Sequence, residues 1–274
     1  MPKHPTFTPD QQAEALEFFT DQNYVVVSDA LPPENVRILT EFVDRSEREI
    51  ATEWGPDKLG CRSHAQILVY HPELDDHVCP PIAYGLVDAI MGPDTRFSQF
   101  DFRDLWDGTS AEPMRWHKDR AYEERSKEDP NRSYDCSYVC AIHYLTDVGE
   151  DQPCFGLVPN SQRYEKFDEA KEKMGDAFGI IPIRGPAGTV VLYNIGIQHT
   201  RINGQGRRLT QHNYFGRAQS PPLTNWVLLP RRLTEHPDPE VRTFYSQWTE
   251  ATKAFAEENY SDEYYNTNVM DKPT

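Results

Sequence analysis

The chain has 274 residues and a formal net charge of −16 at pH 7, and 38% of its residues are hydrophobic. Such a charge repels the phosphates of nucleic acids and anionic membrane surfaces, so we expect neither as a partner. No apolar run approaches the roughly 20 residues of a membrane span, and residues 1–4 lack the apolar core of a signal peptide. We therefore expect a soluble, cytoplasmic protein.

The length predicts one domain with a large core. We expect this domain to cover residues 1–274, with a core at about 8–232 and a C-terminal helix and polar tail at 233–274. Five cysteines, an odd number without a C-x-x-C pair, favour free thiols in a reducing compartment. A structural zinc site at Cys136 and Cys140 is the minor alternative, because their neighbours are typical of a strand.

Hydrophobic periodicity predicts helices and many short strands along the chain. In chain order, the expected helices cover 9–21, a segment beginning at Pro33, 80–90 and 240–255. The expected strands cover 24–27, 67–70, 97–102, 138–145, 156–158, 180–183, 190–193 and 209–215. The charged segment 123–129 has no apolar residue and is expected to form a loop or short lid. This pattern predicts a mainly β fold, a double-stranded β-helix (jelly-roll or cupin-like) barrel flanked by N-terminal and C-terminal helices.

A candidate metal site is formed by the triplet H-x-D at His117 and Asp119 together with a distant histidine, His199. Two imidazoles and one carboxylate suit non-haem Fe(II) and leave coordination positions open. On a strand, His117 and Asp119 would lie on the same face, so the third ligand must come from a neighbouring strand. His199 follows the expected strand 190–193, and His212 is the competing third ligand.

Several segments, in order, resemble the phytanoyl-CoA dioxygenase family of Fe(II)/2-oxoglutarate-dependent oxygenases. Residues 8–27 are similar to the family's opening helix and first strand, and 89–94 to its Leu-Gly-Pro-Asp segment. Residues 145–148 and 158–163 resemble its "L-x-D … P-G-S-H-R" block, with Asn160 and Gln162 in place of the usual Gly and His. The resemblance covers most of the chain, roughly from residue 8 to 215.

The resemblance implies an enzyme in which His117, Asp119 and His199 are the Fe(II) ligands and catalytic residues. Fe(II), 2-oxoglutarate and O2 would be required, and 2-oxoglutarate would become succinate and CO2. A C–H bond of a small metabolite or natural-product intermediate would be hydroxylated or otherwise oxidised, by a monomer or homodimer. Because halogenating relatives lack the carboxylate that Asp119 supplies, halogenation is disfavoured, whereas desaturation, epoxidation and ring formation stay open.

An arginine is expected to hold the distal carboxylate of 2-oxoglutarate, because a guanidinium is always charged and can grip a carboxylate bidentately. When Tyr214 is matched to the family's aromatic residue, counting back along the strand favours Arg207. The short loop after His199 keeps Arg208 open, since one residue of slip turns a strand side chain to the opposite face. If Arg208 points inward, residues 210, 212 and 214 point inward with it.

Three further side chains are candidates for co-substrate contact. Arg103 falls near a basic residue that helps to hold 2-oxoglutarate in relatives, although a structural salt bridge is favoured for it. Tyr138 and Tyr144 could reach a co-substrate or substrate through their hydroxyl groups, although tyrosines on strands usually pack.

Two other classes of protein have the same broad pattern. A jelly-roll metalloenzyme that does not use 2-oxoglutarate would keep the triad and have no use for the arginine. A non-catalytic binding barrel would need neither.

Overall fold

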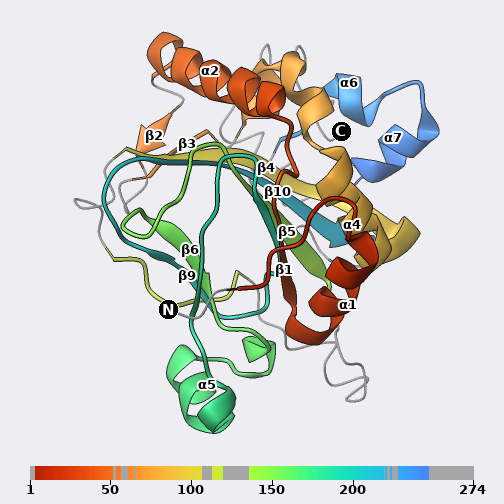
Figure 1. Cartoon of the computed structure of the whole chain (residues 1–274). Helices are drawn as coiled ribbons and strands as arrows, with labels where there is room; N and C mark the ends of the chain where they lie inside the picture. Colours follow the sequence, from red (N-terminus) through yellow and green to blue (C-terminus); the bar gives the residue numbers. More distant parts are fainter. Residues whose placement is uncertain are drawn as a thin grey trace.

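The computed structural model of the protein describes residues 4–51, 54–56, 61–64, 66–106, 113–119, 136–218, 220, 223 and 228–246. Two antiparallel sheets lie within these residues (Figure 1). The larger sheet has the strand order β1-β8-β5-β10-β4-β3-β2, and the smaller has the order β7-β6-β9. The strands are β1 (Tyr24–Val27), β2 (Gly55–Pro56), β3 (Arg62–Ser63), β4 (Thr95–Leu105), β5 (Tyr138–Tyr144), β6 (Cys154–Leu157), β7 (Ile181–Ile183), β8 (Val190–Asn194), β9 (His199–Ile202) and β10 (Arg208–Arg217).

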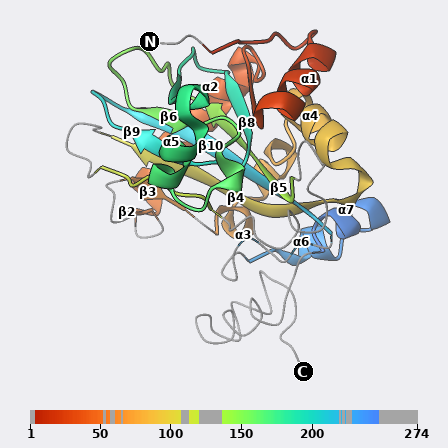
Figure 2. The same cartoon turned by 90° about the horizontal axis from the view of Figure 1, so that it is seen from below.

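Helices cover the outer face of the larger sheet, and the smaller sheet faces its inner side (Figures 1 and 2). The α-helices are α1 (Gln12–Gln22), α2 (Pro33–Glu49), α3 (Ile67–Tyr70), α4 (Pro81–Met91), α5 (Phe167–Met174), α6 (Arg231–Thr234) and α7 (Pro239–Phe244). Short 3-10 helices cover Pro72–His77, Gly92–Asp94, Ser161–Arg163 and Gly175–Ala177. The architecture is the expected mainly β, double-layered barrel with helical additions.

Alternation along the strands divides the buried residues between the two faces of the larger sheet. On β1, Tyr24 and Val26 join the cluster between the two sheets, whereas Val25 and Val27 join the cluster beneath α1 and α4. This period of two is what the strand geometry requires when both faces are covered. The inner layer between the sheets also contains the cavity described below.

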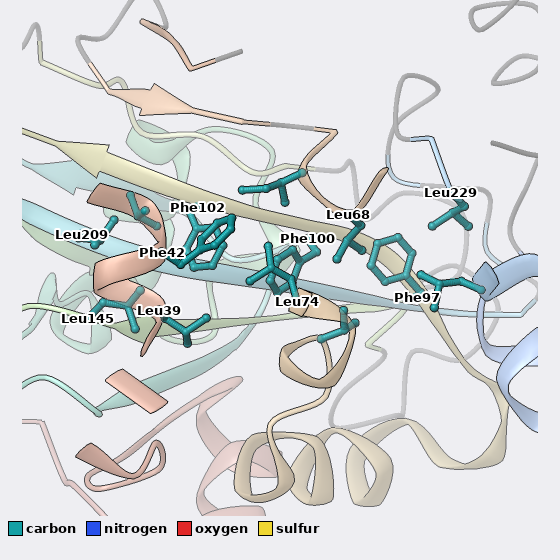
Figure 3. Packing of buried hydrophobic residues seen from close by; sticks show 14 of the residues in the cluster. Leu39, Phe42, Leu68, Leu74, Phe97, Phe100, Phe102, Leu145, Leu209 and Leu229 are labelled. Carbon is teal, nitrogen blue, oxygen red and sulfur yellow. The ribbon is translucent and has the colours of Figure 1, made fainter. Parts of the chain in front are cut away.

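The largest outer cluster consists mainly of leucine and phenylalanine side chains and lies between α2 and strand β4 (Figure 3). Phe42 of α2 contacts Phe102 of β4 with ring centroids 6.0 Å apart, and Phe100 lies 5.4 Å from Phe102 in an edge-on arrangement. Leu229, Leu233 and Tyr245 pack into the same cluster, which joins the C-terminal helices to the barrel.

Truncating Phe102 to Ala is expected to destabilise the fold by about 3–5 kcal/mol, because the fully buried ring leaves a cavity that the sheet cannot close. The midpoint of urea unfolding measures this loss. Ile38 of α2 is 41% exposed and is the matched control, since Ile38→Ala is expected to change stability by about 0.5 kcal/mol or less. Equal losses in the two variants would contradict the assignment of Phe102 to the core.

Most expected elements are present, and two expectations change. Residues 67–70 were expected as a strand and form the helix α3, whose Ile67 and Leu68 pack into the outer cluster. A short apolar run is compatible with a buried helical turn as well as with a strand. Here Pro72 then begins the 3-10 helix Pro72–His77. The expected helix at 240–255 is shorter, because α7 ends at Phe244 and residues 245 and 246 are not helical; residues 247–255 and the expected lid at 123–129 lie outside the described residues.

All five cysteines are free, as expected from their spacing. Cys136 and Cys140 are not part of any cluster of metal-ligating side chains in the described residues. No helix among those residues has the length and apolar character needed to cross a membrane.

Candidate active site

Three side chains that are far apart in the sequence converge on one point inside the barrel. The potential ligand atoms of His117, Asp119 and His199 all lie within 4.8 Å of one another. The Nε2 atoms of both histidines lie 3.5 Å from the same carboxylate oxygen, Oδ1 of Asp119. In the described part of the chain this is the one such cluster of three ligating groups.

The backbone fixes this arrangement through an isolated antiparallel bridge between His117 and His199. Each of the two residues donates its N–H to the carbonyl of the other, at 3.0 and 2.9 Å. His199 follows β8, as expected, but it begins a strand of its own, β9, which pairs with β6 and was not predicted from the sequence. His117 belongs to this single bridge and not to a regular strand in the described residues, yet the H-x-D spacing still brings both side chains together.

Contacts on either side hold the segment that carries His117. Thr200 of β9 donates its hydroxyl to the carbonyl of Met114 at 2.8 Å. The Trp116 ring stacks on Phe167 of α5 with centroids 4.5 Å apart. The metal-site segment is therefore tied both to the smaller sheet and to α5.

Hydrogen bonds select the tautomer that a metal requires. Nδ1 of His117 lies 2.9 Å from the carbonyl oxygen of Arg115, and Nδ1 of His199 lies 2.9 Å from that of Ile197. A carbonyl can only accept, so each Nδ1 carries the proton and each Nε2 presents a lone pair. Both Nε2 atoms face Asp119, which is the donor set of a facial two-histidine, one-carboxylate site.

The electrostatics keep the carboxylate ionised. Burial would raise the pKa of Asp119, but without a metal the charge and Nε2 hydrogen bond of His199 in its protonated form, the corresponding hydrogen bond of protonated His117 and the charge of Arg103 together lower it. Burial would likewise lower the pKa of His117, and its bond to Asp119 raises the pKa instead. An ionised carboxylate beside two imidazoles fits a divalent metal.

A cavity extends from the triad toward the start of β10. Besides the triad it is lined by Arg103 and Arg208, together with Met114, Ile142, Phe155, Tyr193, Thr200, Arg201, His212 and Tyr214. Its wall combines aromatic and apolar side chains with the guanidinium groups of Arg103, Arg201 and Arg208. From the sequence, His212 and Tyr214 were expected to face inward only if Arg208 does; otherwise Tyr214 was the match to the family's aromatic residue and His212 the competing metal ligand.

The two adjacent arginines point to opposite faces. Arg208 is 7% exposed and lines the cavity, and His212 and Tyr214 of the same strand line it too. Arg207 lies outside the cavity, where it donates to the buried carboxylate of Asp104 and, at 2.7 Å, to Asp44. Its guanidinium also lies 4.6 Å from the centre of the Trp106 ring. The preference for Arg207 as the cavity arginine is therefore corrected to Arg208, the alternative that the sequence left open.

The turn before β10 explains this register. A Cβ on Gly204 would clash with the backbone of residues 151–153, and Gly206 has φ of +81°, which favours glycine. Strand β10 then begins at Arg208 and pairs with β4 at Leu105. Arg207 is left just before the strand, where Asp104 and Asp44 attract it.

The remaining candidates divide between cavity and core. Arg103 lines the cavity and also makes the expected salt bridge, with Nε 3.2 Å from Asp101, while Nη2 donates to the Tyr214 hydroxyl at 3.1 Å. Tyr144 donates its hydroxyl to the carbonyl of Ile183 at 2.8 Å, linking the two sheets. Tyr138 is buried in the cluster between the sheets, and neither tyrosine is among the described residues that line the cavity.

Comparisons with known proteins identify the family and the fold. The phytanoyl-CoA dioxygenase (PhyH) family model matches residues 19–200. The fold is similar to the non-haem α-ketoglutarate-dependent carbocyclase SnoK from nogalamycin biosynthesis, with a TM-score of 0.62 and 19% identity over 78% of this chain and 88% of that one.

Two further structures are similar in fold. The epimerase SnoN from nogalamycin biosynthesis has a TM-score of 0.59 and 15% identity, over 77% of this chain and 82% of that one. HygX from Streptomyces hygroscopicus, solved with nickel and 2-oxoglutarate bound, has a TM-score of 0.57 and 16% identity, over 75% of this chain and 87% of that one. No curated protein matches the sequence. By its family model, this chain belongs to the phytanoyl-CoA dioxygenase family and is a 2-oxoglutarate-dependent non-haem iron oxygenase.

Proposed function

We propose that the protein oxidises an unactivated C–H bond of a small metabolite or natural-product intermediate, with conversion of 2-oxoglutarate to succinate and CO2. The observation that carries this proposal is the shared cavity, which contains a two-histidine, one-carboxylate triad and a buried arginine. A metal enzyme that did not use 2-oxoglutarate would have no need of that arginine.

In this proposal His117, Asp119 and His199 hold Fe(II) through two Nε2 atoms and one carboxylate oxygen. Their Nδ1 hydrogen bonds to carbonyl groups keep the rings oriented, which is the usual support for a metal-binding histidine. Bound iron, 2-oxoglutarate and O2 supply the oxidising chemistry, and the chain's own residues supply position and the exclusion of water.

Arg208 is the proposed anchor for the distal carboxylate of 2-oxoglutarate. Its Nε atom is buried and has no hydrogen-bond partner in the described structure, so a donor inside the cavity is left for a ligand. A carboxylate bound there would gain a charge-assisted hydrogen bond in a largely desolvated site. Arg103 lies in the same wall but is already engaged by Asp101 and Tyr214.

Membership of the family does not fix which product the C–H oxidation gives. The similar structures are named as a carbocyclase and an epimerase, so this fold supports several outcomes. Asp119 occupies the position that halogenating relatives leave free for chloride, which disfavours halogenation here. We also infer that the barrel and the C-terminal helices form one catalytic domain, because Leu233 and Tyr245 pack into the same cluster as Phe42.

Succinate formation tests the proposal directly. Protein supplied with Fe(II), 2-oxoglutarate and O2 is expected to form succinate slowly alone and faster with a substrate, as measured by mass spectrometry across a panel of small metabolites. Metal binding without succinate from any mixture would indicate a metalloenzyme that does not use 2-oxoglutarate. Absence of stoichiometric metal binding would indicate a non-catalytic barrel.

A further inference from the structure

Phe167, the first residue of α5, contacts the residue that precedes a metal-site histidine. Its ring stacks on the ring of Trp116, with centroids 4.5 Å apart and an angle of 19° between the ring planes. Successive side chains at an antiparallel bridge point to opposite sides. His117 and Asp119 line the cavity, whereas Trp116 is not among the described residues that line it. Phe167 therefore supports the metal-site segment from the side that faces away from the cavity.

The chain that leads into α5 also holds the residue before the other metal-site histidine. Gln198 precedes His199, and its side-chain amide donates to the carbonyl of Glu165 at 3.1 Å. The backbone N–H of Gln198 donates to the hydroxyl of Ser161 at 2.7 Å. Gln198 is 1% exposed, so water competes little for these hydrogen bonds. Residues 161–167 thus connect the two segments that carry the metal ligands.

The smaller sheet holds these two segments unequally. His199 belongs to β9, which pairs with β6 along its length, whereas His117 joins His199 through an isolated bridge. The N–H of Asp119 donates to the carbonyl of Ile195 at 3.3 Å, which is long for a backbone hydrogen bond. A segment that is in place in only a fraction of the molecules lowers the apparent affinity for metal by that fraction. Contact with α5 raises the fraction.

We infer that Phe167 is a positioning residue for the metal site, because its stack on Trp116 keeps His117 and Asp119 beside His199. A stacked aromatic pair is strong enough to change a local equilibrium by about three-fold to ten-fold. The inference rests on the metal ligands proposed above. It adds a residue that acts on the ligands through another side chain.

Two readouts test this role, and one of them needs no metal. In metal-free protein, Phe167→Ala should speed hydrogen exchange in the peptide that carries His117 and Asp119 by about three-fold to ten-fold, because their N–H groups bond across to residues 195–199. Mass spectrometry measures this exchange. Under nitrogen, the apparent dissociation constant for Mn²⁺, measured by calorimetry, should rise by a similar factor. Phe167→Tyr keeps the stack and should match the unchanged protein in both readouts.

Further variants separate the stack from a general loosening of α5. Phe178→Ala is the matched control, because Phe178 is a half-buried phenylalanine of the same region that contacts Phe167 edge-on at 5.5 Å. It should leave exchange and Mn²⁺ binding within about two-fold of the unchanged protein. Phe167→Leu keeps an apolar side chain without a ring and should show the same losses as Phe167→Ala, even if the alanine variant is less stable in urea. Adding Phe167→Ala to Trp116→Ala should cost no further affinity, because the stack is already absent.

The outcomes distinguish this inference from the proposed function. Normal exchange and Mn²⁺ binding in Phe167→Leu, an equal loss in Phe178→Ala, or additive losses with Trp116→Ala would each overturn the role of Phe167. If His117→Ala abolishes Mn²⁺ binding in the same experiments, the proposed metal site stands without it. Normal Mn²⁺ binding in His117→Ala would overturn the ligand assignment itself, and the role of Phe167 with it.

Discussion

Replacing His117, Asp119 or His199 singly with Ala is expected to abolish 2-oxoglutarate-dependent succinate formation while leaving the fold intact. Each change removes one of three ligand atoms that lie within 4.8 Å of one another, and two remaining ligands hold Fe(II) poorly in an open site. The triad lines a cavity and is not part of the hydrophobic core clusters, so its loss should cost little stability. Succinate release, metal content and the unfolding midpoint are the three measurements.

The matched controls are His236→Ala and Asp176→Ala, which remove the same chemical groups from the C-terminal region and from an exposed 3-10 helix. Both should keep full activity and metal content. Full activity in any of the three triad variants, with normal metal content, would exclude that residue as a ligand.

The metal triad was the part of the site most open to prediction from sequence. The chemistry demands two imidazoles and one carboxylate, and an H-x-D spacing with a later histidine satisfies it whatever the local backbone does. In the structure His117 lies in a single bridge and not in a regular strand, yet its side chain lies beside those of Asp119 and His199. Because the ligand pattern does not depend on the local backbone, the triad could be predicted although His117 does not lie on the regular strand considered for it.

The arginine register could not be fixed from sequence because a turn decides it. Arg207 and Arg208 are chemically identical, and either can begin a strand. The choice depends on the glycine turn at 204–206 and on attraction of Arg207 by Asp104 and Asp44, which are about 100 and 160 residues away in the chain. Ion pairs between residues so far apart in the chain produce no recognisable pattern in the local sequence. Once Arg208 faces inward, however, period two does place His212 and Tyr214 in the cavity, as predicted for that alternative.

The fold, like the site, has elements that the sequence predicts and elements that it does not. Strands with clear alternation or long apolar runs, such as β5 and β8, were predicted nearly to the residue. Residues 67–70 were predicted as a strand and form a helix, because four apolar residues carry no period that separates the two. The helix α5 was not predicted, since its face is largely polar and Ala170 is its one fully buried residue.

The two adjacent arginines are expected to respond to truncation in opposite ways. Arg208→Ala should weaken binding of 2-oxoglutarate by about ten-fold to a hundred-fold, because it loses a charge-assisted contact worth roughly 1.5–3 kcal/mol, with little change in stability. Arg207→Ala should leave binding near normal and destabilise the fold by about 3 kcal/mol. The change leaves the fully buried carboxylate of Asp104 without its ion-pair partner. The expected loss of stability is at the lower end of the range for a broken buried ion pair, because the Arg207 side chain is 24% exposed. Calorimetry with Mn²⁺-loaded protein and urea unfolding measure the two effects separately.

Asp104→Asn is the companion change to Arg207→Ala, since it should reproduce part of the stability loss and should not weaken binding of 2-oxoglutarate. Weaker co-substrate binding in Arg207→Ala than in Arg208→Ala, at unchanged stability, would mean that the strand begins one residue earlier than the structure has it. Unchanged binding in both variants would remove arginine from the co-substrate site and favour a metal enzyme that does not use 2-oxoglutarate.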